Sequence, residues 1–297
     1  MLIGHEKIWN FFENALKSGN LSHAYCFSGL EALGKKTLAR KLAARLLNVE
    51  EPDLEKNPDY YYMERACDEK TGKLKKDISI NQVREMKRRL QGRAISGGYQ
   101  VAVINEAELL RRASNSLLKL LEEPVEKSII ILLTTNVKAI LPTIRSRCQV
   151  VQFWPVEQEQ IKKYLDDEAS DNSQKENICR ASWERPGRAV DMVENPEELV
   201  DYLEEEKRLV GLLSQPFHRK LQMTDDLFGD KTDAMRDRGR IQHVLDLWMM
   251  VWRARLKNGE VTPEKASDIV DCLFQSKRLL GENVHPRLII EQLLLKF

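Results

Sequence analysis

The chain has 297 residues, of which 31% are charged and 42% are hydrophobic, a balance that is typical of a folded, water-soluble protein and excludes disorder over the whole length. Its 47 Lys and Arg residues against 46 Asp and Glu residues give a formal net charge of +1, so overall charge does not attract it to nucleic acid or acidic lipid. No run approaches the roughly 18 uncharged apolar residues of a membrane span, and we therefore expect no contact with a membrane.

The N-terminus and the cysteines indicate a reducing, intracellular setting. Residues 1–6 contain no basic region followed by an apolar run, so we expect no secretory signal and a cytoplasmic location. The five cysteines stand far apart without a C-x-x-C pair, which predicts reduced thiols rather than disulfides or zinc ligands. They are Cys26, Cys67, Cys148, Cys179 and Cys272.

Short apolar runs alternate with helical patterns in the first half of the chain. The runs are rich in β-branched and aromatic residues and cover 24–27, 60–63, 101–104, 129–133 and 150–153. This alternation predicts an α/β fold with a mostly parallel sheet and helices on both faces. Ligands of such folds bind at the carboxyl ends of the strands.

The first run leads into a loop with the spacing of a phosphate-binding loop. Gly29, Gly34 and Lys35 match that spacing between a strand and a helix, and Thr37 lies just beyond. The residue after the lysine is Lys36, where a Ser or Thr hydroxyl would hold magnesium. The residues alone leave two interpretations open, a degenerate phosphate loop and a plain turn before a helix.

A second magnesium position follows the run at 101–104. A carboxylate there normally holds magnesium through water, and the next carboxylate polarises the attacking water. The first position is Asn105 and the second is Glu106, and an amide is a poor substitute for a carboxylate facing this cation. Together with Lys36, this pattern predicts a fold built for nucleoside triphosphates that no longer hydrolyses them.

After Pro155 the strand patterns stop and the chain becomes helical. We expect an α/β domain over 1–155, a small helical domain over 156–204 and a C-terminal helical domain over 205–297, with helices near 157–168, 177–183 and 186–193. The last domain ends in an apolar stripe at helical spacing, formed by Ile289, Ile290, Leu293, Leu294 and Phe297.

Several segments together resemble the clamp-loader branch of the AAA+ ATPases, and within it the delta-prime subunits of bacterial DNA polymerase III. They are 22–25, the loop at 29–37, 105–107 with 116–124, and Ser146-Arg147-Cys148. Residues 183–189 resemble the lid-domain motif of that family, and 284–288 resemble its C-terminal collar. The resemblance implies an AAA+ sheet domain, a helical lid over 156–204 and an oligomerising collar over 205–297.

The resemblance also implies roles for single residues. The family forms a ring with motor subunits and a delta subunit, which loads the sliding clamp onto primed DNA. Arg147 matches the arginine finger that reaches the ATP site of a neighbouring motor subunit. Without the resemblance, a solvated surface position is the usual interpretation of such an arginine. Asn136 matches the sensor position after the fourth strand, and Arg188 matches the sensor arginine of the lid. The chain alone is then not an enzyme.

One departure from the family concerns zinc. Many members carry a four-cysteine zinc module after the loop helix, whereas residues 48–59 contain no cysteine and only Cys67 follows. We therefore predict no zinc. Lys35 and the loop amides remain, which keeps weak ATP binding without hydrolysis open.

Other functions make different demands on the sequence. A working clamp-loader motor, or another active AAA+ ATPase, requires a Ser or Thr after Lys35 and an Asp before Glu106. An independent DNA-binding protein requires a strongly basic domain. The local cluster Arg84, Lys87, Arg88, Arg89 and Arg93, preceded by Lys70, Lys73, Lys75 and Lys76, is diluted by acidic neighbours and is better interpreted as a solvated helix face than as a DNA contact.

Overall fold

The computed structural model describes residues 2–68, 72, 74–92, 94–95, 98–168, 171–228, 234–282 and 284–297. The chain divides into two compact units, each considered by itself. Unit 1 consists of Met1–Ser170 with Glu184–Val190, and unit 2 of Asp171–Trp183 with Asp191–Phe297. The expected domain borders after residues 155 and 204 stay predictions.

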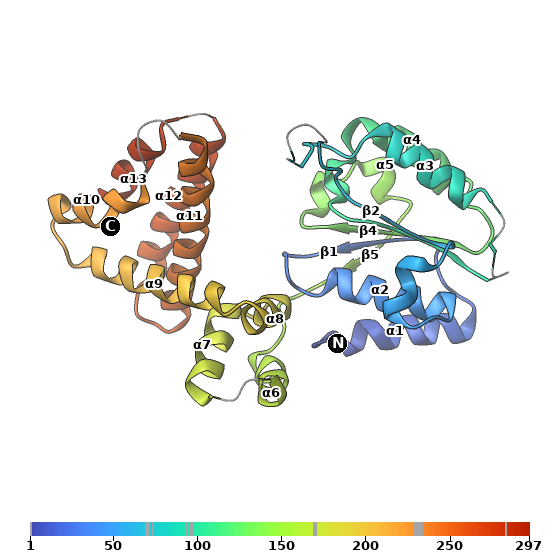
Figure 1. The fold of residues 1–297 in the computed structure, drawn as a ribbon, viewed down its shortest axis with the longest axis horizontal. Coiled ribbons are helices and arrows are strands. Elements are labelled where there is room, and N and C mark those ends of the chain that lie inside the picture. The colour runs from blue at the N-terminus through green and yellow to red at the C-terminus, as the bar shows by residue number, and fades with distance from the viewer. Residues whose placement is uncertain are drawn as a thin grey trace. The chain divides into compact units, whose positions relative to one another are not determined.

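Unit 1 is built around a five-stranded sheet in the order β2-β3-β4-β1-β5. All neighbouring strands are parallel, which confirms the expected sheet and brings every carboxyl end to one edge (Figure 1). The strands are β1 (Ala24–Ser28), β2 (Tyr60–Met63), β3 (Gln100–Ile104), β4 (Ser128–Thr134) and β5 (Gln149–Gln152).

Helices cover both faces of this sheet (Figure 1). On one face, α1 (Glu6–Ser18) and α2 (Lys35–Leu47) share a core with Tyr25 and Phe27 of β1. On the other, α3 (Ile80–Leu90), α4 (Ser114–Glu122) and α5 (Pro142–Arg145) pack with Ala24 and Cys26. Alternate residues of one strand thus enter opposite cores, so the whole strand is buried and reads as an unbroken apolar run.

Unit 2 is helical. Its helices are α7 (Asn172–Ser182), α9 (Pro196–Leu213), α10 (Phe217–Thr224), α11 (Ala234–Lys257), α12 (Pro263–Gly281) and α13 (Pro286–Leu294). Trp248 and Trp252 are fully buried, and the Phe297 ring lies 5.4 Å and 5.9 Å from theirs. The other four residues of the C-terminal stripe lie on α13 and are buried, which confirms their helical spacing as a core pattern, whereas Phe297 follows the end of α13 and is partly buried.

Two segments depart from the predicted elements. Leu110, Ala113, Leu117 and Leu121 recur at helical spacing and predict one helix over 110–121. The structure instead has a 3-10 segment, η2 (Ala107–Ala113), before α4, with a kink at Arg111. Helix α7 begins five residues earlier than expected, because the Asp171 carboxylate accepts from the amide of Ser173 and caps it. Helices α6 (Gln158–Glu168) and α8 (Pro186–Glu194) lie close to their predicted ranges.

In the part of the chain that the structure describes, none of the helices combines the length and the apolar character needed to cross a lipid bilayer.

Candidate functional site

The loop between β1 and α2 has the backbone form of a tight phosphate loop. A Cβ at Gly29 would lie 2.6 Å from the carbonyl oxygen of Phe153, so the close approach of these two backbones requires glycine. Gly34 has φ 84° and leads directly into α2, on whose first turn Lys35 and Thr37 lie. Ala32, at φ 59°, adopts the left-handed conformation that glycine adopts more readily.

The side chain of Lys35 folds back over this loop. Its Nζ donates hydrogen bonds to the carbonyl oxygens of Gly29 at 2.5 Å and Leu30 at 2.6 Å. Burial lowers the pKa of Lys35 to about 8, and the charges of Glu31 and Glu108 oppose that shift. A phosphate bound here would therefore have to replace the loop carbonyls as the partner of this ammonium.

Two further segments of unit 1 hold the loop. The Gly187 amide at the start of α8 donates to the carbonyl of Ala32 at 2.8 Å, and His5 Nε2 lies 2.8 Å from the carbonyl of Leu33. The charge of Arg185 also lowers the pKa of Lys35, so the lid-motif segment brings a second cation into electrostatic range of the loop. Sequence reasoning chose Arg188, farther along α8, and missed Arg185.

The carboxylate after β3 is already engaged. Glu106 receives two hydrogen bonds from Arg65, at 2.7 Å from Nε to Oε2 and at 2.7 Å from Nη2 to Oε1. This bidentate pair raises the pKa of Arg65. Asn105 precedes it, and its backbone amide donates to the carbonyl of Met63 at 2.8 Å. Arg65 carries no sequence signal of this role, because the two partners stand 41 residues apart.

The lysine after the loop lysine is directed to an aromatic ring. Lys36 Nζ lies 4.6 Å from the centre of the Tyr62 ring on β2, a cation–π arrangement. The position that would hold magnesium through a hydroxyl thus carries a cation, which repels a divalent metal.

At the end of β4 the expected sensor residue closes a turn. Asn136 Oδ1 accepts from the amide of Lys138 at 3.0 Å and caps the 3-10 segment η3 (Val137–Ala139). The preceding residue, Thr135, donates from Oγ1 to Glu108 Oε1 at 2.9 Å. The charge of Glu108 acts on Lys35, so the Thr135–Glu108 pair lies within electrostatic range of the loop.

Arg147 follows α5, and its guanidinium donates hydrogen bonds to a backbone carbonyl and to a carboxylate. Nη1 donates to the carbonyl of Thr143 at 2.8 Å, and Nη2 donates to Oε1 of Glu122 at 2.8 Å. Its side chain is 35% exposed, so the guanidinium is fixed without being covered.

The basic segment on α3 is partly neutralised. Arg88 and Arg89 both pair with Glu85, and Arg89 also lies over the Tyr61 ring. Arg93, Lys70 and Lys73 lie outside the described residues.

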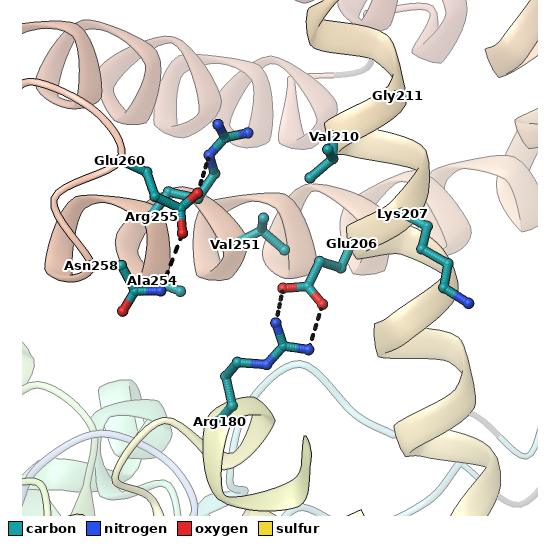
Figure 2. Close-up of a pocket in the computed structure, with 10 residues that line it drawn as sticks. All are labelled: Arg180, Glu206, Lys207, Val210, Gly211, Val251, Ala254, Arg255, Asn258 and Glu260. Atoms are coloured by element: carbon teal, nitrogen blue, oxygen red, sulfur yellow. Dashed lines mark hydrogen bonds and ion pairs between the residues drawn. The ribbon is translucent and has the colours of Figure 1, made fainter. Parts of the chain in front are cut away.

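A pocket of about 500 Å³ opens in unit 2 between α7, α9 and α11 (Figure 2). Arg180 forms two bonds with Glu206, at 3.0 Å and 2.9 Å, and Arg255 pairs with Glu260 at 3.2 Å. The pocket is thus lined by two Arg–Glu ion pairs, and none of the residues that sequence analysis selected lines it.

Comparison with known proteins gives three related findings. The family described as "DNA polymerase III, delta subunit" matches residues 4–157. DNA polymerase III subunit tau of Bacillus subtilis is 33% identical over 162 residues, covering 51% of this chain and 28% of the relative. Subunit gamma of Buchnera aphidicola is 32% identical over 174 residues, covering 55% and 47%. The chain thus spans about half or less of the length of these relatives.

A solved structure extends the likeness to nearly the whole chain. A DNA polymerase III gamma subunit-related protein from Thermotoga maritima superimposes with a TM-score of 0.55 at 19% identity, covering 96% of this chain and 97% of that one. At that identity the likeness establishes the fold of both the sheet-containing part and the helical remainder.

Proposed function

The chain belongs to the DNA polymerase III delta-subunit family, in the clamp-loader branch of the AAA+ proteins, and from this premise we propose that it is a non-hydrolysing, delta-prime-type subunit of a clamp loader. In this role it joins motor subunits and a delta subunit in a ring that places the sliding clamp on primed DNA. Its own loop turns over no ATP, and its Arg147 acts on the ATP bound by a neighbour.

The ion pair between Glu106 and Arg65 is the observation that carries the non-hydrolysing assignment. A carboxylate that polarises an attacking water points a lone pair at that water and keeps its negative charge available to the proton. Here each carboxylate oxygen accepts a 2.7 Å bond from one guanidinium. The pair orients both carboxylate oxygens toward Arg65, and the guanidinium charge offsets the negative charge that would draw a proton from water.

The residues that would surround magnesium support the same proposal. Lys36 places a cation on the Tyr62 ring, and Asn105 offers an amide where a carboxylate is needed. These residues do not fit a magnesium ion. The ammonium of Lys35 and the amides at the start of α2 do fit a phosphate, so we expect at most weak ATP binding without turnover, and we expect no zinc.

Arg147, which follows α5, is the residue that we propose acts on the ATP bound by a neighbouring subunit. The planar guanidinium of Arg147 offers paired N–H donors to two oxygens of a γ-phosphate and neutralises the charge that develops during transfer. Its partial exposure supports a function in a site outside this chain.

The first experiment measures turnover by the chain alone. We expect ATP hydrolysis no faster than a buffer control, with or without primed DNA, because the metal and water positions are lost. Magnesium-dependent turnover that disappears in Lys35→Ala would contradict the non-hydrolysing role and favour the second candidate.

That second candidate is a motor subunit with its own ATPase activity, and the similarity to subunits named tau and gamma favours it. It requires this chain to hydrolyse ATP despite Lys36, Asn105 and the Glu106–Arg65 pair.

The second experiment tests Arg147 in the reconstituted loader with clamp and primed DNA. We expect Arg147→Ala to join the ring normally and to lower the DNA-stimulated ATPase rate, by less than the roughly 10³-fold or more seen for single-site arginine fingers, because other sites in the ring keep theirs. Lysine should rescue poorly, since a point charge does not reproduce the planar fork. Arg145→Ala, which removes an exposed arginine two residues earlier, is the matched control. An unchanged rate in Arg147→Ala would make this residue a surface arginine.

A further inference from the structure

We propose that Glu122 is a positioning residue for Arg147, which holds the guanidinium in a fixed orientation before a neighbouring γ-phosphate arrives. This inference rests on the proposed function of Arg147. It assigns a role to a carboxylate on a different helix, at the end of α4.

The contact geometry fixes the plane of the guanidinium. Glu122 Oε1 accepts from Nη2 and the carbonyl of Thr143 accepts from Nη1, both at 2.8 Å, and Ser146 Oγ lies 3.5 Å from Nη1. Acceptors on both terminal nitrogens remove the freedom of the last side-chain torsion. Among the described residues Nε makes no hydrogen bond, so the edge formed by Nε and Nη2 keeps donors for phosphate oxygens.

The backbones that carry the two residues are held by a shared core. Leu120 and Leu121 of α4 and Ile144 of α5 are buried in the same cluster on one face of the sheet. Glu122 follows Leu121 directly, and Arg147 lies three residues after Ile144 with its amide bonded to the Ile144 carbonyl, so the packed core restrains both backbones. An arginine side chain carries about 2 kcal/mol of rotamer entropy, and ordering it in advance removes part of that cost from the catalytic step.

The exposure of the Glu122–Arg147 ion pair indicates that the contact is weak enough to exchange for a phosphate. The side chains of Glu122 and Arg147 are 48% and 35% exposed, and exposed ion pairs contribute only about 0.2–1 kcal/mol. A pair of this strength orients the guanidinium without outcompeting a phosphate that carries more negative charge. The carboxylate thus guides the arginine and leaves it free to bind the phosphate.

The experiment uses the complete loader with clamp and primed DNA and compares kcat with KM for ATP. We expect Glu122→Ala to lower kcat by roughly two- to fivefold with KM unchanged, because a weak orienting contact is lost in the transition state. Glu122→Gln keeps an acceptor oxygen and should recover most of the rate. Glu123→Ala removes the adjacent exposed carboxylate and should leave the rate unchanged.

The double variant Glu122→Ala with Arg147→Ala shows whether Glu122 acts through Arg147 or independently of it. If Glu122 acts through Arg147, the double variant matches Arg147→Ala alone. A further loss in the double variant, or no loss in Glu122→Ala, overturns the positioning role while Arg147 keeps its function. A faster Glu122→Ala means that the carboxylate restrains the arginine instead, and this also overturns the proposal. If Arg147→Ala itself has no effect on the rate, the proposed function of Arg147 is wrong, and the positioning role of Glu122 is wrong with it.

Discussion

Adjacent lysines in the loop helix have opposite environments. Lys35 is 9% exposed and donates to two loop carbonyls, whereas Lys36 is exposed and lies over the Tyr62 ring. Burial of an ammonium disfavours its charged form, and this lowers the pKa of Lys35 to about 8. The free energy of unfolding should therefore depend on pH through this residue.

We expect the stability of the wild-type chain, relative to Lys35→Met, to rise between pH 8 and pH 10. Over this range the unfolded lysine, with its ordinary pKa of 10.5, keeps a proton that the folded residue, with a pKa of about 8, has released. Stability increases with pH wherever the unfolded state binds more protons, by at most about 1.4 kcal/mol per pH unit for one group. Urea unfolding at several pH values measures the difference.

The matched control is Lys36→Met, which removes the exposed lysine next in the chain and should show no comparable rise. A difference between wild type and Lys35→Met that stays constant or falls with pH would show that the folded ammonium is not destabilised by burial.

Sequence reasoning at the residue scale could identify positions along the chain but not pairings across it. Gly29, Lys35, Asn105 and Glu106 follow predicted strands, so their place at the carboxyl edge of the sheet follows from topology. Arg65, which engages Glu106, stands 41 residues away, and no spacing rule connects such partners.

At the scale of elements, the start of α8 and the loop before α2 form one packed unit. The Gly187 amide donates to the Ala32 carbonyl at 2.8 Å, and a Cβ at Gly187 would lie 2.9 Å from that oxygen and 3.0 Å from the Ala32 Cα. Both contacted atoms belong to the backbone, which yields less readily than a side chain. Glycine at this position therefore sets the distance between the helix and the loop.

We expect Gly187→Ala to destabilise unit 1 by about 1–3 kcal/mol, because the added methyl group forces two backbones apart. Denaturant unfolding measures the change, and hydrogen exchange of the loop amides should accelerate with it. Gly239→Ala in α11 is the control, since no atom lies within 4 Å of its Cβ position and alanine favours a helix interior by about 0.5–1 kcal/mol. Equal stability of Gly187→Ala and wild type would show that the loop adjusts freely.

The strands are easier to predict from the sequence than the ends and types of the helices. The five strands are predicted within a residue or two because buried parallel strands read as continuous apolar runs. The start of α7 is missed because its first turn is polar, and only the Asp171 cap marks it. The 3-10 form of η2 is missed because its apolar spacing also fits an α-helix, while the kink at Arg111 breaks the backbone pattern.

For the whole molecule, the expected border after residue 204 falls inside α9. This helix runs from Pro196 to Leu213, and its Glu205 accepts a 3.3 Å bond from Nε1 of Trp248 on α11. Truncation there would expose the core of unit 2 and would report on folding instead of assembly. Substitution of single surface residues is the sharper test of the proposed collar.

The C-terminal stripe and the exposed apolar residues of unit 2 should therefore respond differently. Ile290 is fully buried, and Ile290→Ala should cost about 2–5 kcal/mol of stability because it leaves a cavity. Phe274 on α12 and Leu288 on α13 are each 59% exposed, so their substitution removes little from the core. A single exposed apolar residue is ordinary on a protein surface, so these two residues are chosen because they lie in the proposed collar.

We expect Phe274→Asp to leave the free energy of unfolding within about 0.5 kcal/mol of wild type and to weaken assembly with the motor and delta subunits. Burying a new carboxylate against a partner leaves an unpaired charge at the contact, which opposes association strongly, whereas the same charge in the free subunit is solvated. Gel filtration of the mixed subunits measures assembly. Gln275→Asp introduces the same charge at the next exposed position of α12 and should assemble normally. Normal assembly of Phe274→Asp together with failure of Leu288→Asp would move the contact to α13, and normal assembly of both would place the ring contacts away from these two apolar residues.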